Sequence, residues 1–117
     1  MRRFLSRSIF ALSLTLLLTA TSMAKPRTFH ELVDAYFDDY FKAHPTAGTL
    51  AGFHQYDNRL EDFSLASHTE TRQRLVKYLA EFQAINPRTL STLDRDDREI
   101  MIATIHSALL EEERVQM

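Results

Sequence analysis

The sequence has no cysteine, two glycines and three prolines. The absence of cysteine excludes a disulfide framework, a zinc site built from thiolates and a lipid-modified cysteine after an export signal. It does not exclude export, because many exported proteins contain no disulfide. Few glycines and prolines, together with many Leu, Ala, Glu and Arg residues, favour helix over strand. We therefore predict an all-α fold.

An excess of basic residues is also missing. The formal net charge of the 117 residues is -2, and residues 25–117 alone carry 11 basic and 16 acidic side chains, a formal charge of -5. A mildly acidic chain has no electrostatic reason to bind nucleic acid or an anionic membrane surface. We therefore expect no nucleic-acid partner. The length leaves room for one domain at most.

Residues 1–24 have the three parts of a secretory signal peptide. An apolar run covers residues 8–20, and small residues precede a cut that we place between Ala24 and Lys25. The positive start of the segment contains Arg2, Arg3 and Arg7. The alternative is an uncleaved membrane anchor, but the apolar run is well short of the ~20 residues that span a bilayer. We predict a periplasmic or secreted protein with no stable membrane association after cleavage.

The first mature helix is predicted to begin at Thr28, because Thr28 and Glu31 match a capping box. Apolar residues then recur at spacings of three and four, which places them on one stripe of a helix. They are Phe29, Leu32, Val33, Tyr36, Phe37, Tyr40 and Phe41. Pro45 ends this helix, since it disfavours helical geometry for His44. We interpret the largely aromatic stripe as a packing face.

A second long helix is predicted to begin at Ser64 or Ser67. Both serines are good caps, and Ser67 forms a second capping box with Glu70. Proline cannot continue a helix, so Asn86-Pro87 ends it. The side chains expected to face inward are Leu75, Val76, Leu79, Phe82 and Ile85.

Ser91 is predicted to open the last helix, with Asp94 as a variant of the capping box. Its apolar face is expected to contain Ile100, Met101, Ile102, Thr104, Ile105, Ala108, Leu109 and Leu110. Residues 111–113 are all Glu, and acidic groups in a last turn meet the negative end of the helix dipole. We therefore expect this helix to continue in a longer protein. Residues 25–117 would be the helical N-terminal segment of a longer domain, truncated at residue 117.

His30-Glu31-Leu32-Val33-Asp34 begins like the zinc helix His-Glu-x-x-His. That motif needs two imidazoles one turn apart, both facing one metal ion. Here Asp34 takes the place of the second histidine, and the sequence offers no third ligand. We therefore interpret Glu31 as a capping residue, and we predict no metal ligand and no catalytic residue in the chain.

The segment from Pro45 to Ser64 is the densest in residues that helical packing does not explain. Residues 46–52 are predicted to form two turns of helix that stop at Gly52. Residues 53–63 are predicted to be irregular. Three of their side chains are expected to fold back onto the helices, namely Tyr56, Leu60 and Phe63. The candidate cleft-lining or structural residues are Gly52, His54, Tyr56, Asp57, Arg59 and Asp62.

Two interpretations of these polar residues are open. His54 polarised by Asp57, or an ion pair between Asp57 and Arg59, would suit a functional site. Alternatively the segment is a structural turn, in which Asp57 caps backbone amides and Arg59 pairs with Asp62.

At this segment the sequence resembles the N-terminal region of a bacterial family catalogued as domain of unknown function 885. The family has an export signal and a helix of the type F-x-x-L-x-x-x-Y-F, here Phe29, Leu32, Tyr36 and Phe37. A run P-x-x-A-T-x-x-G-x-H-x-Y-D-x-R-L-x-D-x-S follows, matched here over residues 45–64 with Gly48 inserted between Ala47 and Thr49. The start of the last helix, Ser91 to Arg98, is also similar. The resemblance covers nearly all of residues 28–110.

Full-length members of that family are several times longer, largely helical, and look like zinc metallopeptidases with a zinc helix far downstream. The resemblance implies that zinc belongs to full-length relatives and that this chain, with no cofactor of its own, is inactive alone. Its partner would be the missing C-terminal half, whose substrate cleft the N-terminal helices help to wall. The alternative is a stand-alone exported helical adaptor that dimerises through its apolar faces. A third interpretation is a remnant with no function.

Overall fold

The computed structural model describes residues 25–115, which are helical with no strand. The all-α prediction is therefore confirmed. The elements are α1 (Phe29–Ala43), α2 (Pro45–Leu50), α3 (Leu65–Ala84) and α4 (Thr92–Val115), with 3-10 turns η1 (His54–Tyr56) and η2 (Pro87–Thr89). The signal peptide predicted for residues 1–24 lies outside the described residues.

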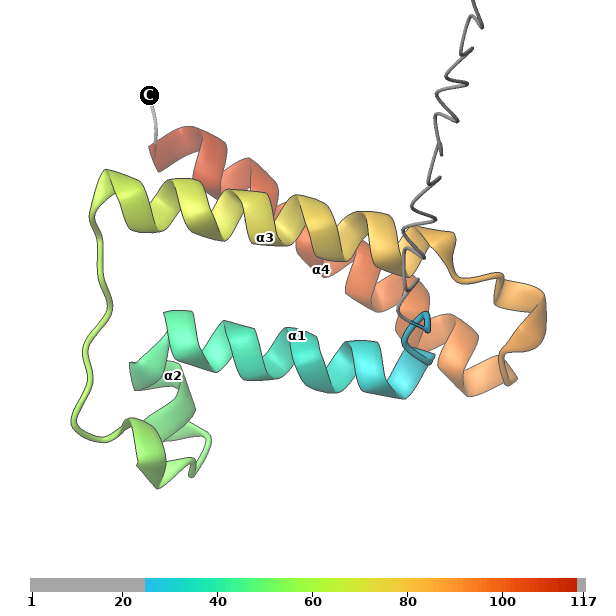
Figure 1. The fold of residues 1–117 in the computed structure, drawn as a ribbon, viewed down its shortest axis with the longest axis horizontal. Coiled ribbons are helices and arrows are strands. Elements are labelled where there is room, and N and C mark those ends of the chain that lie inside the picture. Colours follow the sequence, from blue (N-terminus) through green and yellow to red (C-terminus); the bar gives the residue numbers. More distant parts are fainter. Residues whose placement is uncertain (1–24, 116–117) are drawn as a thin grey trace, which may run out of the picture.

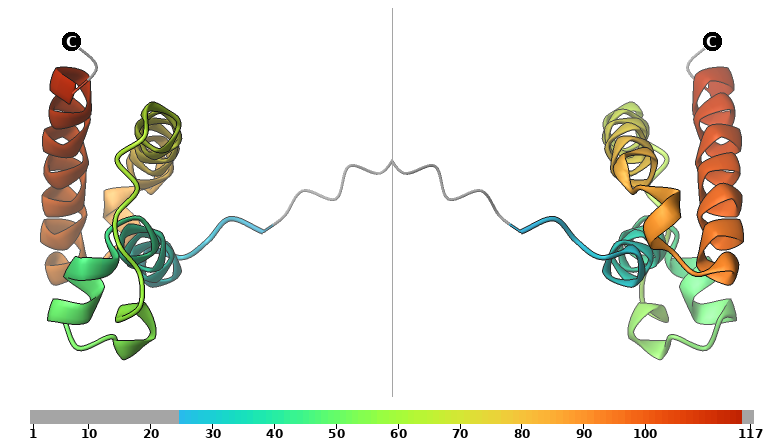
Figure 2. Two further views of the ribbon diagram at one scale, coloured as in Figure 1. Left: turned by 90° about the vertical axis from the view of Figure 1, so that its left-hand side faces the viewer. Right: turned by 90° about the vertical axis from the view of Figure 1, so that its right-hand side faces the viewer.

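Three helices, α1, α3 and α4, share one core. In Figure 1, α1 and α3 run side by side in opposite directions, and α4 crosses behind them. Viewed from the ends, α1 and α3 lie one above the other with α4 beside them (Figure 2). The buried core contains Phe29, Leu32, Tyr36, Leu75, Tyr78, Phe82, Met101 and Ile105. From the sequence we expected a loose three-helix arrangement or a hairpin with a detached first helix, and α1 is not detached.

The start of α1 matches the sequence prediction. The Thr28 hydroxyl accepts from the Glu31 N–H at 3.3 Å, and the Glu31 carboxylate accepts from the Thr28 N–H at 2.7 Å. The hydrogen bonds that the Thr28 N–H and hydroxyl donate to the Glu31 carboxylate favour its charged form and lower its pKa. The helix ends at Ala43, and Pro45 becomes the first residue of α2, a position that needs no N–H donor.

Ser64, and not Ser67, caps α3. The Ser64 hydroxyl accepts from the Ser67 N–H at 3.2 Å, so Ser67 lies inside the first turn and the capping box predicted with Glu70 is wrong. At α4, the Ser91 hydroxyl accepts from the Asp94 N–H at 3.0 Å, as predicted.

The inward face of α3 differs from the prediction at two positions, Val76 and Tyr78. Its buried residues are Leu75, Tyr78 and Phe82, whereas Val76 is 50% exposed. Spacings of three and four keep side chains on one helix face, and Tyr78 satisfies them between Leu75 and Phe82. The expectation for Val76 is therefore wrong, and the helical period could have identified Tyr78.

The apolar faces of α1 and α4 are only partly covered. On α1 the core ends at Tyr36, while Phe37 is 42% and Tyr40 is 37% exposed. On α4, Ile100 and Leu110 are also exposed, contrary to prediction. Each helix has only two long neighbours, so a wide apolar face cannot be covered on all sides.

Candidate functional site

The connection between α2 and α3 was the main sequence-predicted site. Tyr56 is buried, as predicted, but Leu60 is 83% and Phe63 is 78% exposed, so the expectation for those two is wrong. The reason is the path of the chain, which runs along the outside end of the bundle between η1 and α3 (Figure 1). The Leu60 and Phe63 side chains are therefore left mostly in solvent.

The two glycines of the chain lie before η1, Gly48 inside α2 and Gly52 just after its end. A Cβ atom on Gly48 would lie 2.6 Å from Cδ2 of Tyr56, so the glycine lets the aromatic ring pack directly on α2. Gly52 has a φ of 91°, a conformation that strains other residues, and it follows the end of α2 as predicted. One glycine therefore provides space, and the other provides backbone freedom.

Gly48→Ala is expected to lower the free energy of unfolding by about 1–3 kcal/mol, because the new methyl group overlaps the Tyr56 ring. Urea denaturation followed by circular dichroism measures the change. The added substitution Tyr56→Leu should recover part of the loss. Gly52→Ala is the matched control, since its strain comes from the backbone and Tyr56→Leu should not relieve it. If Gly48→Ala lowered the free energy of unfolding equally in the wild-type and Tyr56→Leu backgrounds, the contact between residue 48 and the Tyr56 ring would be contradicted.

Of the side-chain pairings considered for this polar segment, the structure shows the one between His54 and Asp57. His54 Nδ1 lies 3.0 Å from Asp57 Oδ2. Hydrogen bonds from His54 and then from Thr49 lower the pKa of Asp57. A carboxylate on Nδ1 leaves the other ring nitrogen of a histidine available as a proton acceptor or ligand. The His54 side chain is 82% exposed, however, so water competes for both groups of the pair.

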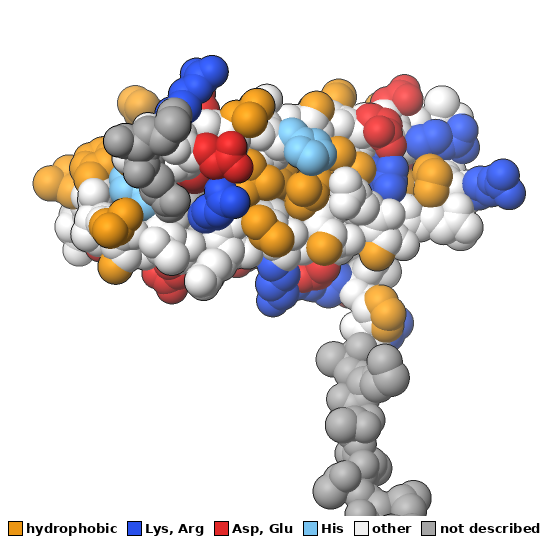
Figure 3. Space-filling model, turned by 90° about the horizontal axis from the view of Figure 1, so that it is seen from above, with side chains coloured by type: hydrophobic (Ala, Val, Ile, Leu, Met, Phe, Trp, Pro, Cys, Tyr) orange, Lys and Arg blue, Asp and Glu red, His pale blue; other side chains and the backbone are white. Residues whose placement is uncertain are grey.

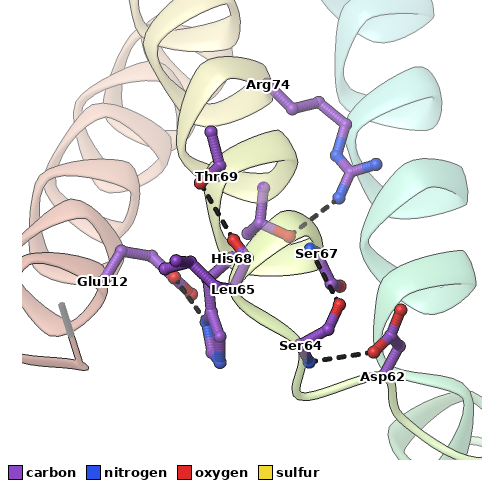
Figure 4. A network of polar contacts seen from close by, with 9 residues as sticks. Asp62, Ser64, Leu65, Ser67, His68, Thr69, Arg74 and Glu112 are labelled. Atoms are coloured by element: carbon purple, nitrogen blue, oxygen red, sulfur yellow. Dashed lines mark hydrogen bonds and ion pairs between the residues drawn. The ribbon is translucent and has the colours of Figure 1, made fainter.

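Arg59 and Asp62 do not join this pair. Arg59 Nη2 donates to the backbone carbonyl of Lys42 at 3.4 Å, which ties the connection to the end of α1. Asp62 Oδ1 accepts from the Ser64 N–H at 2.9 Å, and this bond lowers the pKa of Asp62 (Figure 4). Because Asp57 and Asp62 each have another partner, the two ion pairs considered for Arg59 from the sequence are wrong.

The zinc-like stretch on α1 forms no metal site. His30 and Asp34 are exposed, and His30 Nε2 lies 3.5 Å from Asp94 Oδ1 of α4. Within residues 25–115, no three His, Asp or Glu side chains lie close enough together to hold a metal ion. The donor set that a zinc centre needs is therefore not assembled by these residues, and we assign no zinc chemistry to them.

A groove of 330 Å³ lies between the second half of α1, the first half of α3 and the second half of α4. Toward this end of the bundle α4 diverges from α1 (Figure 1). The walls include Tyr36, Tyr40, Ala43, Leu75, Tyr78 and Ala108, and the polar lining includes Asp39, Arg74, Glu111 and Glu112. Sequence reasoning missed this groove because its lining comes from three separate helices.

Tyr78 places its hydroxyl group in the mainly apolar wall of the groove, between two hydrogen-bonding partners. Its hydroxyl donates to Asp39 Oδ2 at 2.6 Å and lies 2.8 Å from the Ala35 carbonyl. Burial, and then the contact with Asp39, raise the pKa of Tyr78 to about 12. For Asp39, burial acts to raise the pKa, but hydrogen bonds from Tyr78 and Lys42 outweigh it and lower the pKa.

The stability that Tyr78 contributes should be lost between pH 10 and pH 12. Its pKa is about 12 in the folded chain and 10.0 as a free phenol, so above pH 10 the unfolded state loses the proton first and is favoured. Unfolding free energies of wild type and Tyr78→Phe, measured from pH 9 to pH 12, test this. The variant should lose about 1 kcal/mol at neutral pH and show a shallower decline above pH 10. Parallel curves above pH 10 would show that Tyr78 does not carry the effect.

The acidic end of α4 is bound to α3. His68 Nδ1 lies 2.8 Å from Glu112 Oε2 in a mostly buried pair, and Arg72 Nη1 lies 3.3 Å from Glu113 Oε1. Figure 4 shows His68 reaching from the first turn of α3 to Glu112 on α4. Two of the three glutamates that are unfavourable with the helix dipole therefore gain a partner across the bundle.

Exposed hydrophobic side chains are spread over the face seen from above in Figure 3, between acidic and basic groups. Residues 25–115 thus form an all-helical segment with an open groove and incompletely covered apolar faces. Comparison of the chain with protein-family models, with curated proteins and with solved structures found no match in any of the three. The resemblance to the domain of unknown function 885 family therefore stays an expectation from the sequence.

Proposed function

We propose that this chain is the exported, helical N-terminal segment of a protein similar to the domain of unknown function 885 family. The observation that carries the proposal is the uncovered half of the aromatic stripe on α1. Phe37 and Tyr40 are more than one-third exposed, and Tyr40 borders the 330 Å³ groove. Large aromatic side chains contribute most when they are buried, so a partner surface is expected here.

The occupant of the groove, in this proposal, is a helix from the remainder of the same protein. The groove is bounded by three helices, and helices pack by inserting side chains into the grooves between their neighbours' side chains. Its walls are mainly aliphatic and aromatic, which suits the apolar face of a helix. The segment would then help to wall the substrate cleft of the complete protein.

In this proposal the catalytic groups lie in the remainder of the protein. Full-length relatives of the resembled family look like zinc metallopeptidases, and a zinc helix there would supply the Lewis acid and the activated water for hydrolysis. Residues 25–115 assemble no such ligand set. The segment would thus support the fold and the cleft, and would be inactive alone.

A steric block of the groove tests this role. Ser107 lines the groove and is exposed, so Ser107→Arg should place a charged side chain in it without disturbing the core. Ala103→Arg is the matched control, since Ala103 is exposed on α4 outside the groove. The reading frame is expected to continue past Met117 and to encode a zinc helix. In that longer protein, Ser107→Arg should release the N-terminal segment to limited proteolysis, whereas Ala103→Arg should not. Equal sensitivity of both variants would overturn the proposed packing.

The second candidate, a stand-alone helical adaptor, is favoured by the same exposed faces if they pair between two copies. It predicts a stop codon after Met117 and a dimer in gel filtration of residues 25–117. Ser107→Arg should then convert the dimer to a monomer. The downstream DNA sequence separates the two candidates before any protein is made.

Export is part of the proposal. In the described part of the chain, no helix combines the length and hydropathy needed to cross a bilayer. We expect the protein recovered from the periplasm or the medium to begin at Lys25. N-terminal sequencing of the mature protein tests this expectation, and a protein that retains Met1 in the membrane fraction would indicate an uncleaved anchor instead.

A further inference from the structure

A second, polar pocket lies between the end of α1, the connection after η1 and the first turns of α3. Its volume is 250 Å³. Three elements each contribute one basic side chain to its lining, Lys42 from α1, Arg59 from the connection and Arg74 from α3. Figure 4 shows Arg74 and Asp62 on the side of α3 that faces α1, away from the His68–Glu112 pair.

The two guanidinium groups of this pocket lack a carboxylate partner within the described part of the chain. Arg59 donates to the Lys42 carbonyl at 3.4 Å, and Arg74 donates to the Thr71 hydroxyl at 3.0 Å. Neither forms an ion pair with any residue from 25 to 115. Each guanidinium has five N–H donors arranged to bind the oxygens of a carboxylate or phosphate, so most of these donors are unused.

Two acidic side chains, Asp62 and Glu70, also line the pocket and reduce its positive charge. Asp62 is already engaged as an acceptor of the Ser64 N–H, at the cap of α3. Glu70 precedes Arg74 by one helical turn, a spacing at which the two can pair, yet Arg74 bonds to Thr71 instead. The lining carries three basic and two acidic groups, a formal charge of +1 in a mature chain of formal charge -5.

We propose that this pocket binds an oxyanion, either a carboxylate or a phosphate group. Arg59 and Arg74 would donate hydrogen bonds to its oxygens, while Lys42, which already pairs with Asp39 Oδ1 at 3.4 Å, would add only part of its charge. Charge-assisted hydrogen bonds of this kind are about twice as strong as neutral ones. Glu70 competes with the ligand for Arg74 and so weakens binding. The site lies beside the groove of the function proposed above and shares Arg74 with it, but anion binding is measured on this chain alone and does not depend on what fills the groove.

Titration of the full chain with inorganic phosphate and, separately, with acetate tests the site. The Nε–H resonances of Arg59 and Arg74 are followed by NMR at constant ionic strength, with chloride as the reference anion. Saturable shifts of both resonances are expected. The anion with the lower Kd identifies the ligand chemistry, phosphate or carboxylate.

Four variants distinguish specific binding in this pocket from nonspecific electrostatic attraction of anions to the protein. Arg59→Gln and Arg74→Gln should each raise Kd about tenfold, the loss of one charge-assisted interaction. Arg95→Gln, an exposed cation on α4 outside the pocket, should leave Kd unchanged. Glu70→Gln should lower Kd several-fold, a gain that misfolding cannot produce. Absence of saturable shifts, an unchanged Kd in Glu70→Gln, or equal effects of Arg95→Gln and Arg59→Gln would overturn the proposal.

Discussion

Phe82→Ala is expected to lower the free energy of unfolding by about 3–5 kcal/mol. Phe82 is fully buried on α3, and its ring meets the rings of Phe29 and Tyr36 edge-on at centroid distances of 6.2 and 6.5 Å. Truncation would therefore leave a cavity between α1 and α3 and remove two aromatic contacts. Since a small domain is stable by only about 5–15 kcal/mol, much of the chain's stability depends on this one side chain.

Urea denaturation monitored at 222 nm measures the effect. Val76→Ala is the control on the same helix, because Val76 is half exposed and should cost less than about 1 kcal/mol. Similar losses for the two variants would mean that α1 does not pack on α3 as described.

Arg98→Ala is expected to cost about 2–4 kcal/mol through a different mechanism. Arg98 is the one buried charged residue of the described chain, with 8% of its surface exposed. Its Nε donates to the Phe82 carbonyl at 2.9 Å and its Nη2 to the Gln83 carbonyl at 3.1 Å. These carbonyls belong to the last turn of α3, where the Phe82 carbonyl has only the cap N–H of Ile85, at 3.3 Å, as a further partner. Glu99 pairs with Arg98 Nη1. Removal of the guanidinium would take a charge-assisted donor away from both carbonyls.

A series of substitutions at this position distinguishes hydrogen bonding from charge alone. Arg98→Lys keeps a cation near the negative end of the α3 dipole but loses the forked donor geometry, so it should recover only part of the loss. Arg95→Ala, one turn earlier and exposed, should be close to neutral. Full recovery by lysine would show that charge, and not the two specific hydrogen bonds, explains the role of Arg98.

The helix boundaries were largely predictable because the signals that set them are local. Thr28 with Glu31, and Ser91 with Asp94, place their hydrogen-bonding groups within three residues of each other, and both caps form. The close packing of Tyr56 on Gly48 was only half predictable. Tyr56 was expected to be buried, but its partner depends on how α2 and η1 fold against each other.

The candidate sites were less predictable, since they depend on residues far apart in the chain. Arg98 was not expected in the core, because a buried cation is explained only by the carbonyls of α3 that it reaches. Glu112 and Glu113 indicated only an unfavourable helix end, whereas their partners His68 and Arg72 lie more than 40 residues away. Spacing along one helix carries no information about such contacts.

The amino-acid sequence alone determined that this protein is helical, where α1 begins and ends, where α4 begins, and which side chains of α1 could enter a core. Capping and a 3.6-residue period are properties of neighbouring residues. Tertiary structure alone decided that the buried part of the α1 stripe ends at Tyr36 and that a groove and a basic pocket open beside α1. Those outcomes depend on which helix surfaces meet, and with only three long helices in the described chain, part of every apolar face is left in contact with water.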